Sequence, residues 1–390
     1  MSRAIEVRLK TPAHEMAQEE ILKQVEFLSR SLTNPRFTEG GAVLGFDAPE
    51  GEADDLAGRA GELAARVQKG LRSLKRKVAY RSPAADRPTF RGVGSGAGVH
   101  PLGRGQVALD GLPLKLYRYF DRVFEGFGDP WQARPVLAPV LIPTAVLAKC
   151  DYFRSFPNNV TFACHLAEDE DRVEGFRARH KDRDDVDART KDDLEVPEVC
   201  LCPAICYHIY HMNRGQTVPA SGAAFGLCGR CFRYESGGMT GLRRLWDFTM
   251  REVVFLGGRD EVLAHRETSI AMMSAFLDEH RLAGEIRTAS DPFFTAPDAM
   301  AKTYFQITSE TKYEISLMLG EDDRLAVGSH NYHTDFFGRA FDVGVEGGGP
   351  MHSVCVAFGL ERWVLAFLTQ HGDDPAHWPD PVRSAPEFRG

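Results

Sequence analysis

Five arginines stand close together in residues 229–252, which read GRCFRYESGGMTGLRRLWDFTMRE. Arginine presents a planar and permanently charged fork that matches phosphate oxygens. In the same stretch, Phe248 offers an aromatic face on which a purine can stack, and Glu235 offers a carboxylate that can accept hydrogen bonds from an amino group. These residue types predict an ATP site that uses no glycine-rich phosphate loop.

An antiparallel hairpin is expected to position these side chains. Arg233 and Glu235 are two residues apart in CFRYE, so in a strand they point to the same face. The segment SGGMTGLRR is a loop, and LWDFTMREVVFL returns as the second strand. A charged surface hairpin with scattered ion pairs is the alternative. The open face of the hairpin and its loop would present Arg233, Glu235, Phe248, Glu252, Arg243 and Arg244.

A second candidate phosphate-binding segment lies near the C-terminus, in GGGPMHSVCVAFGLERWVLAFL. A glycine-rich turn leads to an apolar strand, and Gly359-Leu360-Glu361-Arg362 then opens a helix. Arg362 at a helix start is well placed for a terminal phosphate. By contrast, the glycine-rich residues 91–105 have no strand before them and no Gly-Lys-Ser/Thr after them, so we expect a linker or flexible loop there.

These stretches resemble the motifs of a known superfamily. Phe232-Arg233-x-Glu235, followed by a loop and by Gly241-Leu242-x-Arg244-x-x-x-Phe248-x-x-x-Glu252, is similar to motif 2 of class II aminoacyl-tRNA synthetases of the seryl type. Gly359-Leu360-Glu361-Arg362 resembles motif 3, and residues 113–143 resemble the dimer-forming motif 1. The resemblance covers about 112–375 and implies an α+β fold, with an antiparallel sheet of six strands flanked by helices.

A narrower resemblance is to the amino acid:[carrier protein] ligases, truncated relatives of the atypical, zinc-dependent seryl-tRNA synthetases. The phrases CDYFRSFP, MREVVFLG and CVAFGLERW look like theirs. The long helical hairpin or large mixed domain with which seryl-tRNA synthetases grip tRNA is not expected, because the first 110 residues show only one long helical pattern, over 54–78. The resemblance implies activation of glycine or alanine with ATP and Mg²⁺, and transfer to the phosphopantetheine thiol of a small acidic carrier protein.

The resemblance also implies roles for individual residues. Arg233 would hold the α-phosphate of ATP and Arg362 the γ-phosphate, and both act in catalysis together with Glu235. Arg244 is a further candidate for binding ATP. Phe248 would stack on adenine while Glu235 contacts its amino group. In the strand TKYEISL, Glu314 would help to hold Mg²⁺. In GSHNYHTDF, Ser329 and Asn331 would face the amino-acid substrate.

A zinc site is implied by the same resemblance. Cys206, Glu252 and Cys355 stand where the atypical seryl enzymes and the carrier-protein ligases hold an active-site zinc. Two thiolates and one carboxylate leave a fourth tetrahedral position open, which an amino group could fill. In an alternative interpretation, CLCPAIC and CGRC supply a closed structural site from Cys200, Cys202, Cys228 and Cys231. Cys150 and Cys164 fit small buried hydrophobic positions.

The chain of 390 residues is long enough for two domains. We expect an accessory α/β domain over 1–110 and the synthetase-like catalytic domain over 111–390. Residues 168–195 are so densely charged that they cannot be buried, and they predict a solvated helix or mobile insertion. The resemblance to motif 1 implies a homodimer.

Composition excludes several classes. A formal net charge of −8 argues against a large basic surface for nucleic acid, so no tRNA partner is expected. No run of 18 apolar residues occurs, and the start lacks a signal-peptide core, so we expect a cytoplasmic protein without membrane contact. Two alternatives stay open: a seryl-type tRNA synthetase with a reduced tRNA arm, and a non-catalytic ATP- or zinc-binding paralogue. Intact Arg233, Glu235 and Arg362 argue against the paralogue.

Overall fold

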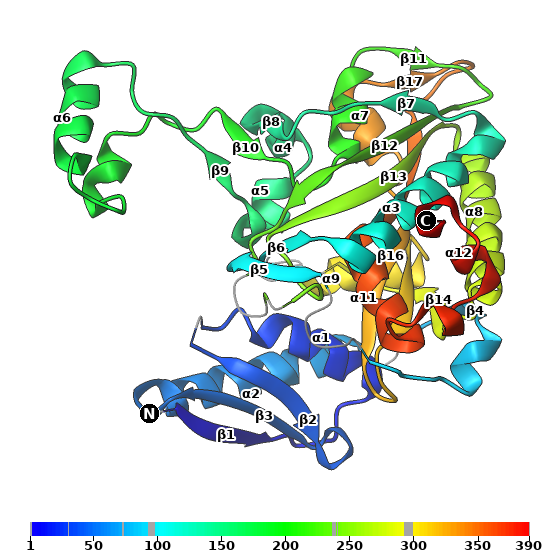
Figure 1. The fold of residues 1–390 in the computed structure, drawn as a ribbon, viewed down its shortest axis with the longest axis horizontal. Helices are drawn as coiled ribbons and strands as arrows, with labels where there is room; N and C mark the ends of the chain where they lie inside the picture. The colour runs from blue at the N-terminus through cyan, green and yellow to red at the C-terminus, as the bar shows by residue number, and fades with distance from the viewer. Residues whose placement is uncertain are drawn as a thin grey trace.

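A large mixed sheet forms the centre of the fold (Figure 1). The computed structural model describes residues 2–29, 31–71, 74–92, 98–235, 239, 241–291 and 299–389. The eight strands of the sheet lie in the order β4 (Val78–Arg81), β14 (Gly284–Thr288), β15 (Lys312–Met318), β16 (Arg324–Tyr332), β18 (His352–Gly359), β13 (Asp247–Gly257), β12 (Ala223–Phe232) and β7 (Arg134–Val136).

The six strands from β14 to β12 pair antiparallel throughout, which confirms the expected α+β fold with an antiparallel sheet. Two short strands extend it, because β4 adds to one edge antiparallel and β7 to the other edge parallel. The expected hairpin forms as β12 and β13, but β12 ends at Phe232, so Arg233 and Glu235 follow the strand and do not alternate within it as expected. The apolar strand before motif 3 is β18. Residues 236–238 and 240 of the hairpin loop lie outside the described residues.

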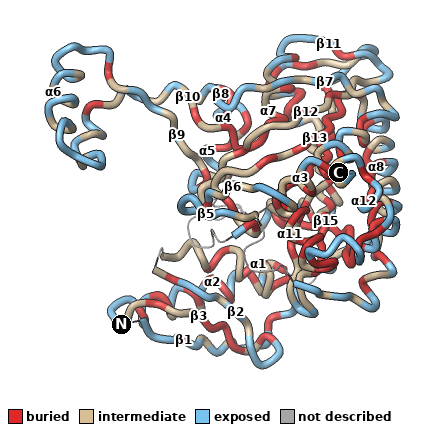
Figure 2. Tube along the Cα trace, in the orientation of Figure 1, coloured by how far each residue is buried: buried red, intermediate tan, exposed pale blue. Residues whose placement is uncertain are grey.

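Each face of the sheet carries its own apolar core. On one face, Val253, Val356 and Phe358 pack with helices α3 (Gly111–Glu125), α8 (Arg259–Glu279) and α11 (Leu360–His371). On the other face, Val254 and Ala357 pack with α4 (Thr144–Lys149), α7 (Cys206–Met212) and α10 (Phe336–Phe341). Alternate residues of one strand therefore belong to different cores, as strand geometry requires. Figure 2 shows the buried segments concentrated in this sheet and its helices.

The N-terminal residues form a separate small core under three strands and two helices. Strands β1 (Ser2–Arg8), β3 (Val43–Pro49) and β2 (Thr33–Thr38) pair in that order, and α1 (Glu15–Val25) and α2 (Ala53–Leu71) bury apolar faces against them. The helix expected over 54–78 thus ends at Leu71. Val78 matches its period by coincidence, because pairing with β14 in the large sheet decides the conformation of residues 78–81.

Residues 78–110 were expected in the N-terminal domain, yet the described strands among them, β4, β5 and β6, contact the large domain. β4 joins the large sheet, and the hairpin of β5 (Val99–Gly103) and β6 (Gln106–Leu109) packs partly buried apolar side chains on the core of α3, α8 and α11. The remaining helices are α5 (Tyr152–Ser155), α6 (Glu170–His180), α9 (Ala299–Thr308) and α12 (Asp380–Arg383), and the remaining strands are β8 (Leu141–Pro143), β9 (Phe162–Ala163), β10 (Val199–Leu201), β11 (Thr217–Val218) and β17 (Gly344–Val345).

Helix α6 stands away from the rest of the chain at the end of two connecting segments (Figure 1). It buries no side chain, and its N-cap Asp169 accepts a hydrogen bond from the backbone N of Arg172 at 2.9 Å. Capping and charge, and not packing on a core, support this helix. Among the described residues, no helix has the length and apolar character that a membrane span requires.

Phe124 of α3 tests the packing of the core between the sheet and helices α3, α8 and α11. Its ring is fully buried and stacks on Phe358 with ring centroids 4.2 Å apart. Truncating a buried phenylalanine leaves a cavity, so Phe124→Ala should lower the free energy of unfolding by about 3–5 kcal/mol. Urea denaturation followed by fluorescence measures this. Val196→Ala, at a position 83% exposed, should change it by less than about 0.5 kcal/mol. Equal effects of the two changes would contradict the packing described.

Candidate active site

Strand register places the candidate site residues on one face of the large sheet. Glu252 pairs with Ala357, Ala357 with Ser329, and Ser329 with Glu314. A parallel row one step along contains Cys355, Asn331 and Lys312. Residues directly opposite each other in antiparallel strands share a face, so both rows project to the side of α7 and α10. The opposite side of the same strands is the filled core of α3, α8 and α11.

A pocket opens on this face between the hairpin and the start of α11. Six of the candidate residues line it. Arg243, Arg244 and Asn331 lie outside its lining, and Cys206, Glu252 and Cys355 form a group of their own beside it. The side chain of Asn331 donates a hydrogen bond from Nδ2 to Oγ of Ser329 at 2.9 Å. The six lining candidates are Arg233, Glu235, Phe248, Glu314, Ser329 and Arg362.

Arg233 and Arg362 are both anchored by backbone carbonyls. The Nε of Arg233 donates to the carbonyl of Pro203 at 2.9 Å, and its guanidinium lies 5.4 Å from the ring centroid of Phe248. Arg362 donates from Nε to the carbonyl of Arg243 at 2.9 Å and from Nη1 to that of Ala326 at 3.0 Å. Within the described part of the chain, Nη2 of Arg362 has no acceptor. Each arginine is therefore fixed in direction.

The charge of Arg233 is supported by its neighbours. Burial by itself lowers the pKa of this guanidinium, but Tyr152, Cys231 and Glu235 outweigh burial and raise the pKa. Burial lowers the pKa of Arg362, which two further arginines also depress. The carboxylate of Glu235 opposes this shift, but burial and the two arginines outweigh it. An arginine close to other arginines is suited to an anionic ligand, because binding the anion relieves the repulsion.

Lys312 and Asp291 were not singled out from the sequence, although Lys312 contributes to the pocket wall and Asp291 holds it in place. Lys312 lines the pocket and pairs with Asp291, whose carboxylate also accepts a hydrogen bond from Nε2 of Gln306 at 2.7 Å. Burial opposes ionisation, yet Lys312 lowers the pKa of Asp291 to about 2. Lys312 could have been found, because it stands two residues before Glu314 in a strand and must share its face.

Arg244 is held by two carboxylates. Its Nε lies 3.0 Å from Oε2 of Glu235, and its guanidinium also pairs with Glu26, which follows α1 of the N-terminal domain. Neighbouring Arg243 instead pairs with Asp323. The candidate nucleotide residue Arg244 is thus paired with carboxylates of the protein and is not part of the pocket lining.

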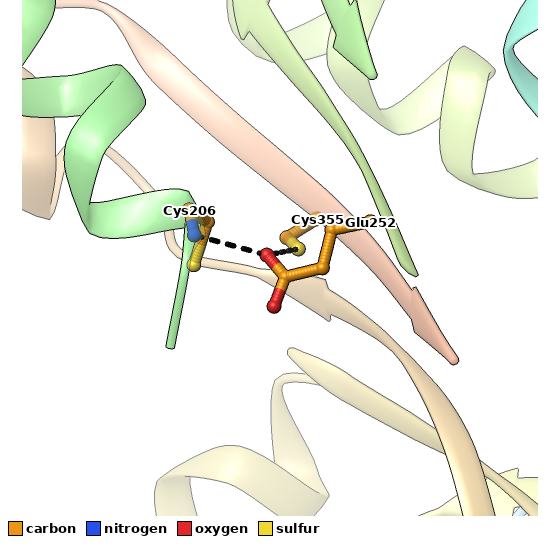
Figure 3. A group of neighbouring side chains, drawn as sticks. All are labelled: Cys206, Glu252 and Cys355. Atoms are coloured by element: carbon orange, nitrogen blue, oxygen red, sulfur yellow. Dashed lines mark hydrogen bonds between the residues drawn. The ribbon is translucent and has the colours of Figure 1, made fainter. Parts of the chain in front are cut away.

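A candidate metal centre lies beside the pocket. One ligand atom each of Cys206, Glu252 and Cys355 lies within 4.8 Å of the others, and all three residues are buried (Figure 3). Oε2 of Glu252 accepts hydrogen bonds from the backbone N of Cys206 at 3.1 Å and from Sγ of Cys355 at 3.2 Å. Cys206 belongs to α7, Glu252 to β13 and Cys355 to β18. Two sulfur donors and one carboxylate are a donor set that zinc accepts, so the residues fit the ion that the resemblance implies.

The pKa values of all three groups are raised, and a bound cation would lower them. Burial raises the pKa of Glu252, and the hydrogen bond with Cys206 together with burial raises that of Cys355. The hydrogen bond with Cys355 lowers the pKa of Cys206, but burial and the carboxylate of Glu252 outweigh it, so this pKa is also raised. A divalent cation would favour the deprotonated forms.

The alternative structural zinc site is wrong. Cys228 and Cys231 are three residues apart in β12, so they point to opposite faces. Cys231 is buried in the core of α7 and α10, whereas Cys228 packs against the core of α3. Across the ranges that the structure describes, Cys206, Glu252 and Cys355 are the one group of three metal-ligand side chains that gathers.

Comparison with curated proteins identifies relatives. No protein-family model matches the chain. The chain is 34% identical over 249 residues to amino acid–[acyl-carrier-protein] ligase 2 of Bradyrhizobium diazoefficiens. The aligned region covers 63% of this chain and 72% of that protein. It is 33% identical to ligase 1 of the same organism, over 63% of this chain and 74% of that one. With the type-2 serine–tRNA ligase of Methanopyrus kandleri it shares 26% identity, over 64% of this chain and 50% of that protein.

Solved structures agree on the fold. The seryl-tRNA synthetase of M. kandleri, in complex with A. aeolicus tRNASec, superimposes with a TM-score of 0.65 at 21% identity, over 98% of this chain and 77% of that one. The seryl-tRNA synthetase of Pyrococcus horikoshii, complexed with ATP, gives a TM-score of 0.53 at 14% identity, over 86% and 81%. At these identities the likeness concerns the fold alone.

The sequence relatives, the class II synthetase fold and the one-sided arrangement of the candidate residues point the same way. Since the chain spans 72% of a relative with which it shares 34% identity, the family follows from the sequence comparison itself. The chain belongs to the amino acid–[acyl-carrier-protein] ligases, enzymes of the class II aminoacyl-tRNA synthetase superfamily that are related to type-2 seryl-tRNA synthetases.

Proposed function

We propose that this ligase activates glycine or alanine with ATP and transfers the aminoacyl group to the phosphopantetheine thiol of a small acidic carrier protein. The observation that carries the proposal is the pocket lined by Arg233, Phe248 and Arg362 directly beside the buried Cys206–Glu252–Cys355 group. In this proposal one sheet face would supply the phosphate, adenine and amino-group contacts that an aminoacyl-adenylate needs.

In the first half-reaction, a carboxylate oxygen of the amino acid attacks the α-phosphorus of ATP, and the bond to the bridging oxygen of pyrophosphate breaks. Arg233 would bind the α-phosphate and Arg362 the γ-phosphate, while Glu314 would help to hold Mg²⁺. Phe248 would stack on adenine and Glu235 would accept from its amino group. Such a step is accelerated mainly by positioning and by stabilising the charge on the phosphate oxygens. Anchored arginines suit that role, because they need no reorganisation.

Cys206, Glu252 and Cys355 would hold a zinc ion. When bound, the ion supplies a Lewis acid that binds the amino group of the substrate in its neutral form. Ser329 and Asn331 would contact the rest of the amino acid. Behind the ligand group the space is filled, since Tyr210 is fully buried and its ring stacks on Phe337 at 4.0 Å between centroids. This packing supports a small side chain on the substrate.

In the second half-reaction, the thiol sulfur of phosphopantetheine attacks the carbonyl carbon of the aminoacyl-adenylate, a thioester forms and AMP leaves. The names of the two Bradyrhizobium ligases support a carrier protein as acceptor. Transfer RNA is the second candidate, because the M. kandleri synthetase of the tRNASec complex superimposes on 98% of this chain. A homodimer through residues 113–143 is proposed as well, and it is supported by the 93% exposure of Leu137 in that segment.

Zinc content tests the proposed metal ligands. Purified protein should carry about one zinc per chain, and Cys206→Ser or Cys355→Ser should lose it, because a serine hydroxyl stays protonated and is a poor zinc ligand. Because all three pKa values are raised in the metal-free group, the affinity of zinc should increase as the pH increases. Metal analysis and a competition titration at several pH values measure both effects.

Cys231→Ser is the matched control for the zinc experiment. The thiol of Cys231 is also fully buried, but it does not belong to the ligand group. The zinc content of the Cys231→Ser variant should therefore equal that of the wild type. Full zinc in Cys206→Ser and Cys355→Ser, or loss of zinc in Cys231→Ser alone, would show that the proposed ligands are wrong.

Arg233→Lys tests the phosphate contact. Lysine keeps the positive charge but cannot reproduce the two-pronged geometry, so amino-acid-dependent pyrophosphate exchange should fall about tenfold or more. Arg339→Lys makes the same change at a side chain that is 70% exposed and should leave the rate unchanged. An unaltered exchange rate in Arg233→Lys would remove this arginine from the catalytic group.

Substrate and acceptor are tested together. In a pyrophosphate-exchange panel of twenty amino acids, glycine and alanine should be activated at similar rates, because one methyl group changes binding by only about 1–3 kcal/mol. Valine and leucine should be excluded sterically. Radiolabelled glycine should then pass to a phosphopantetheinylated carrier protein and not to total tRNA offered beside it. A maximum on a large or charged amino acid, or label on tRNA, would contradict the proposal.

A further inference from the structure

Helix α1 of the N-terminal domain turns a charged face toward the large domain. Glu15, Glu19, Lys23 and Glu26 follow one another at steps of four, four and three residues, which places them along one side of the helix and its C-cap. The other side of α1 buries Ile21 and Val25 in the N-terminal core. In Figure 1, α1 lies between the N-terminal sheet and the large domain.

This charged face makes ion pairs along its length. At the start of α1, Arg287 of β14 pairs with Glu15 at 3.5 Å and with Glu19 at 2.8 Å. At the end, Arg244 of the motif 2 hairpin pairs with Glu26. Arg287 lies opposite Glu314 in the paired strands, on the row that leads to Ser329 in the pocket. The N-terminal domain thus contacts the sheet face that carries the nucleotide pocket.

Arg244 lies outside the pocket lining, unlike its neighbours in the hairpin. Glu235, Leu242 and Leu245 line the pocket, whereas Arg244 does not. Its side chain is 27% exposed and lies against Glu26, which is 17% exposed, and against Glu235. A triphosphate bound in the pocket would draw the guanidinium of Arg244 away from Glu26. Two carboxylates that are partly shielded from water therefore compete with the phosphates for this arginine.

We infer that Glu26 is a positioning residue through which the N-terminal domain controls access of ATP to Arg244. In the nucleotide-free enzyme Glu26 holds Arg244 outside the pocket, and the triphosphate of ATP, which carries more negative charge, takes the arginine from it. The pairs of Arg287 with Glu15 and Glu19 are not involved, so the start of α1 stays attached while its end is released. The inference rests on the ATP-dependent function proposed above.

Glu26→Gln is the variant that tests this inference, because it keeps the size of the side chain and removes its charge. Mg·ATP binding to the full chain is measured by calorimetry, which needs neither the amino acid nor the carrier. Without the competing carboxylate the dissociation constant of ATP should fall by about fivefold, the upper range for a partly exposed ion pair. Glu62→Gln, an exposed change on α2 of the same domain, is the matched control and should bind ATP as the wild type does.

Hydrogen exchange supplies a readout that altered stability alone would not give. In the wild type, Mg·ATP should increase exchange at the backbone amides of residues 22–26, because the end of α1 loses its partner. In Glu26→Gln these amides should exchange faster before ATP is added and change little afterwards. Glu26→Asp keeps the charge and should restore most of the wild-type dissociation constant.

The outcomes separate this inference from the proposed function. If the wild type binds no Mg·ATP, the proposed function fails and the inference fails with it. If the wild type binds Mg·ATP but Glu26→Gln binds it equally well or more weakly, Glu26 does not compete with the nucleotide, and the inference alone is overturned. Slower exchange at residues 22–26 on addition of ATP would overturn it as well, since the nucleotide would then tighten the contact.

Discussion

The antiparallel register of β13, β18 and β16 is the constraint on which the rest of the molecule depends. It aligns Glu252, Ala357 and Ser329 in one row and Cys355 with Asn331 in the next. Because side chains alternate between faces, a slip of one residue in any of these strands would turn its site residues into the packed core of α3, α8 and α11. The two filled cores keep the strands in register, so the same burial that stabilises the fold also specifies the site.

Motifs 2 and 3 are joined by the buried carboxylate of Glu361. Glu361 accepts hydrogen bonds from the backbone N of Thr249 at 2.9 Å and from its Oγ1 at 3.0 Å. Its residue neighbour, Arg362, starts the pocket side of α11, and Phe248 precedes Thr249 on β13. The buried pair therefore fixes the distance between the aromatic face and the arginine. Burial raises the pKa of Glu361, and the backbone N–H of Thr249 opposes that shift.

Sequence patterns predicted the parts of this structure that local periodicity determines. Alternation in LWDFTMREVVFL indicated a strand, and it forms as β13. Its partner β12 was expected over CFRYE, but it lies earlier in the chain and includes only Cys231 and Phe232 of that stretch. The helix expected over 54–78 was too long, since Leu74 and Val78 fit its period while sheet pairing determined the conformation of Val78. The pair of Arg244 with Glu26 could not be predicted, because the two residues are 218 positions apart and a charge pattern on α1 does not indicate which arginine it meets.

Strand β13 sets a fixed length between the two ends of the proposed adenylate. Phe248, Met250 and Glu252 alternate on one face, so the candidate adenine contact and the candidate metal ligand are about 13 Å apart along the strand. A strand held by neighbours on both sides cannot lengthen to suit a larger substrate. If adenine is held at one end and the amino group at the other, a bulkier side chain has to find room beside the metal ligands, where Tyr210 already fills the space. The proposed selectivity for small amino acids would then follow from the rigidity of the sheet as much as from any single pocket residue.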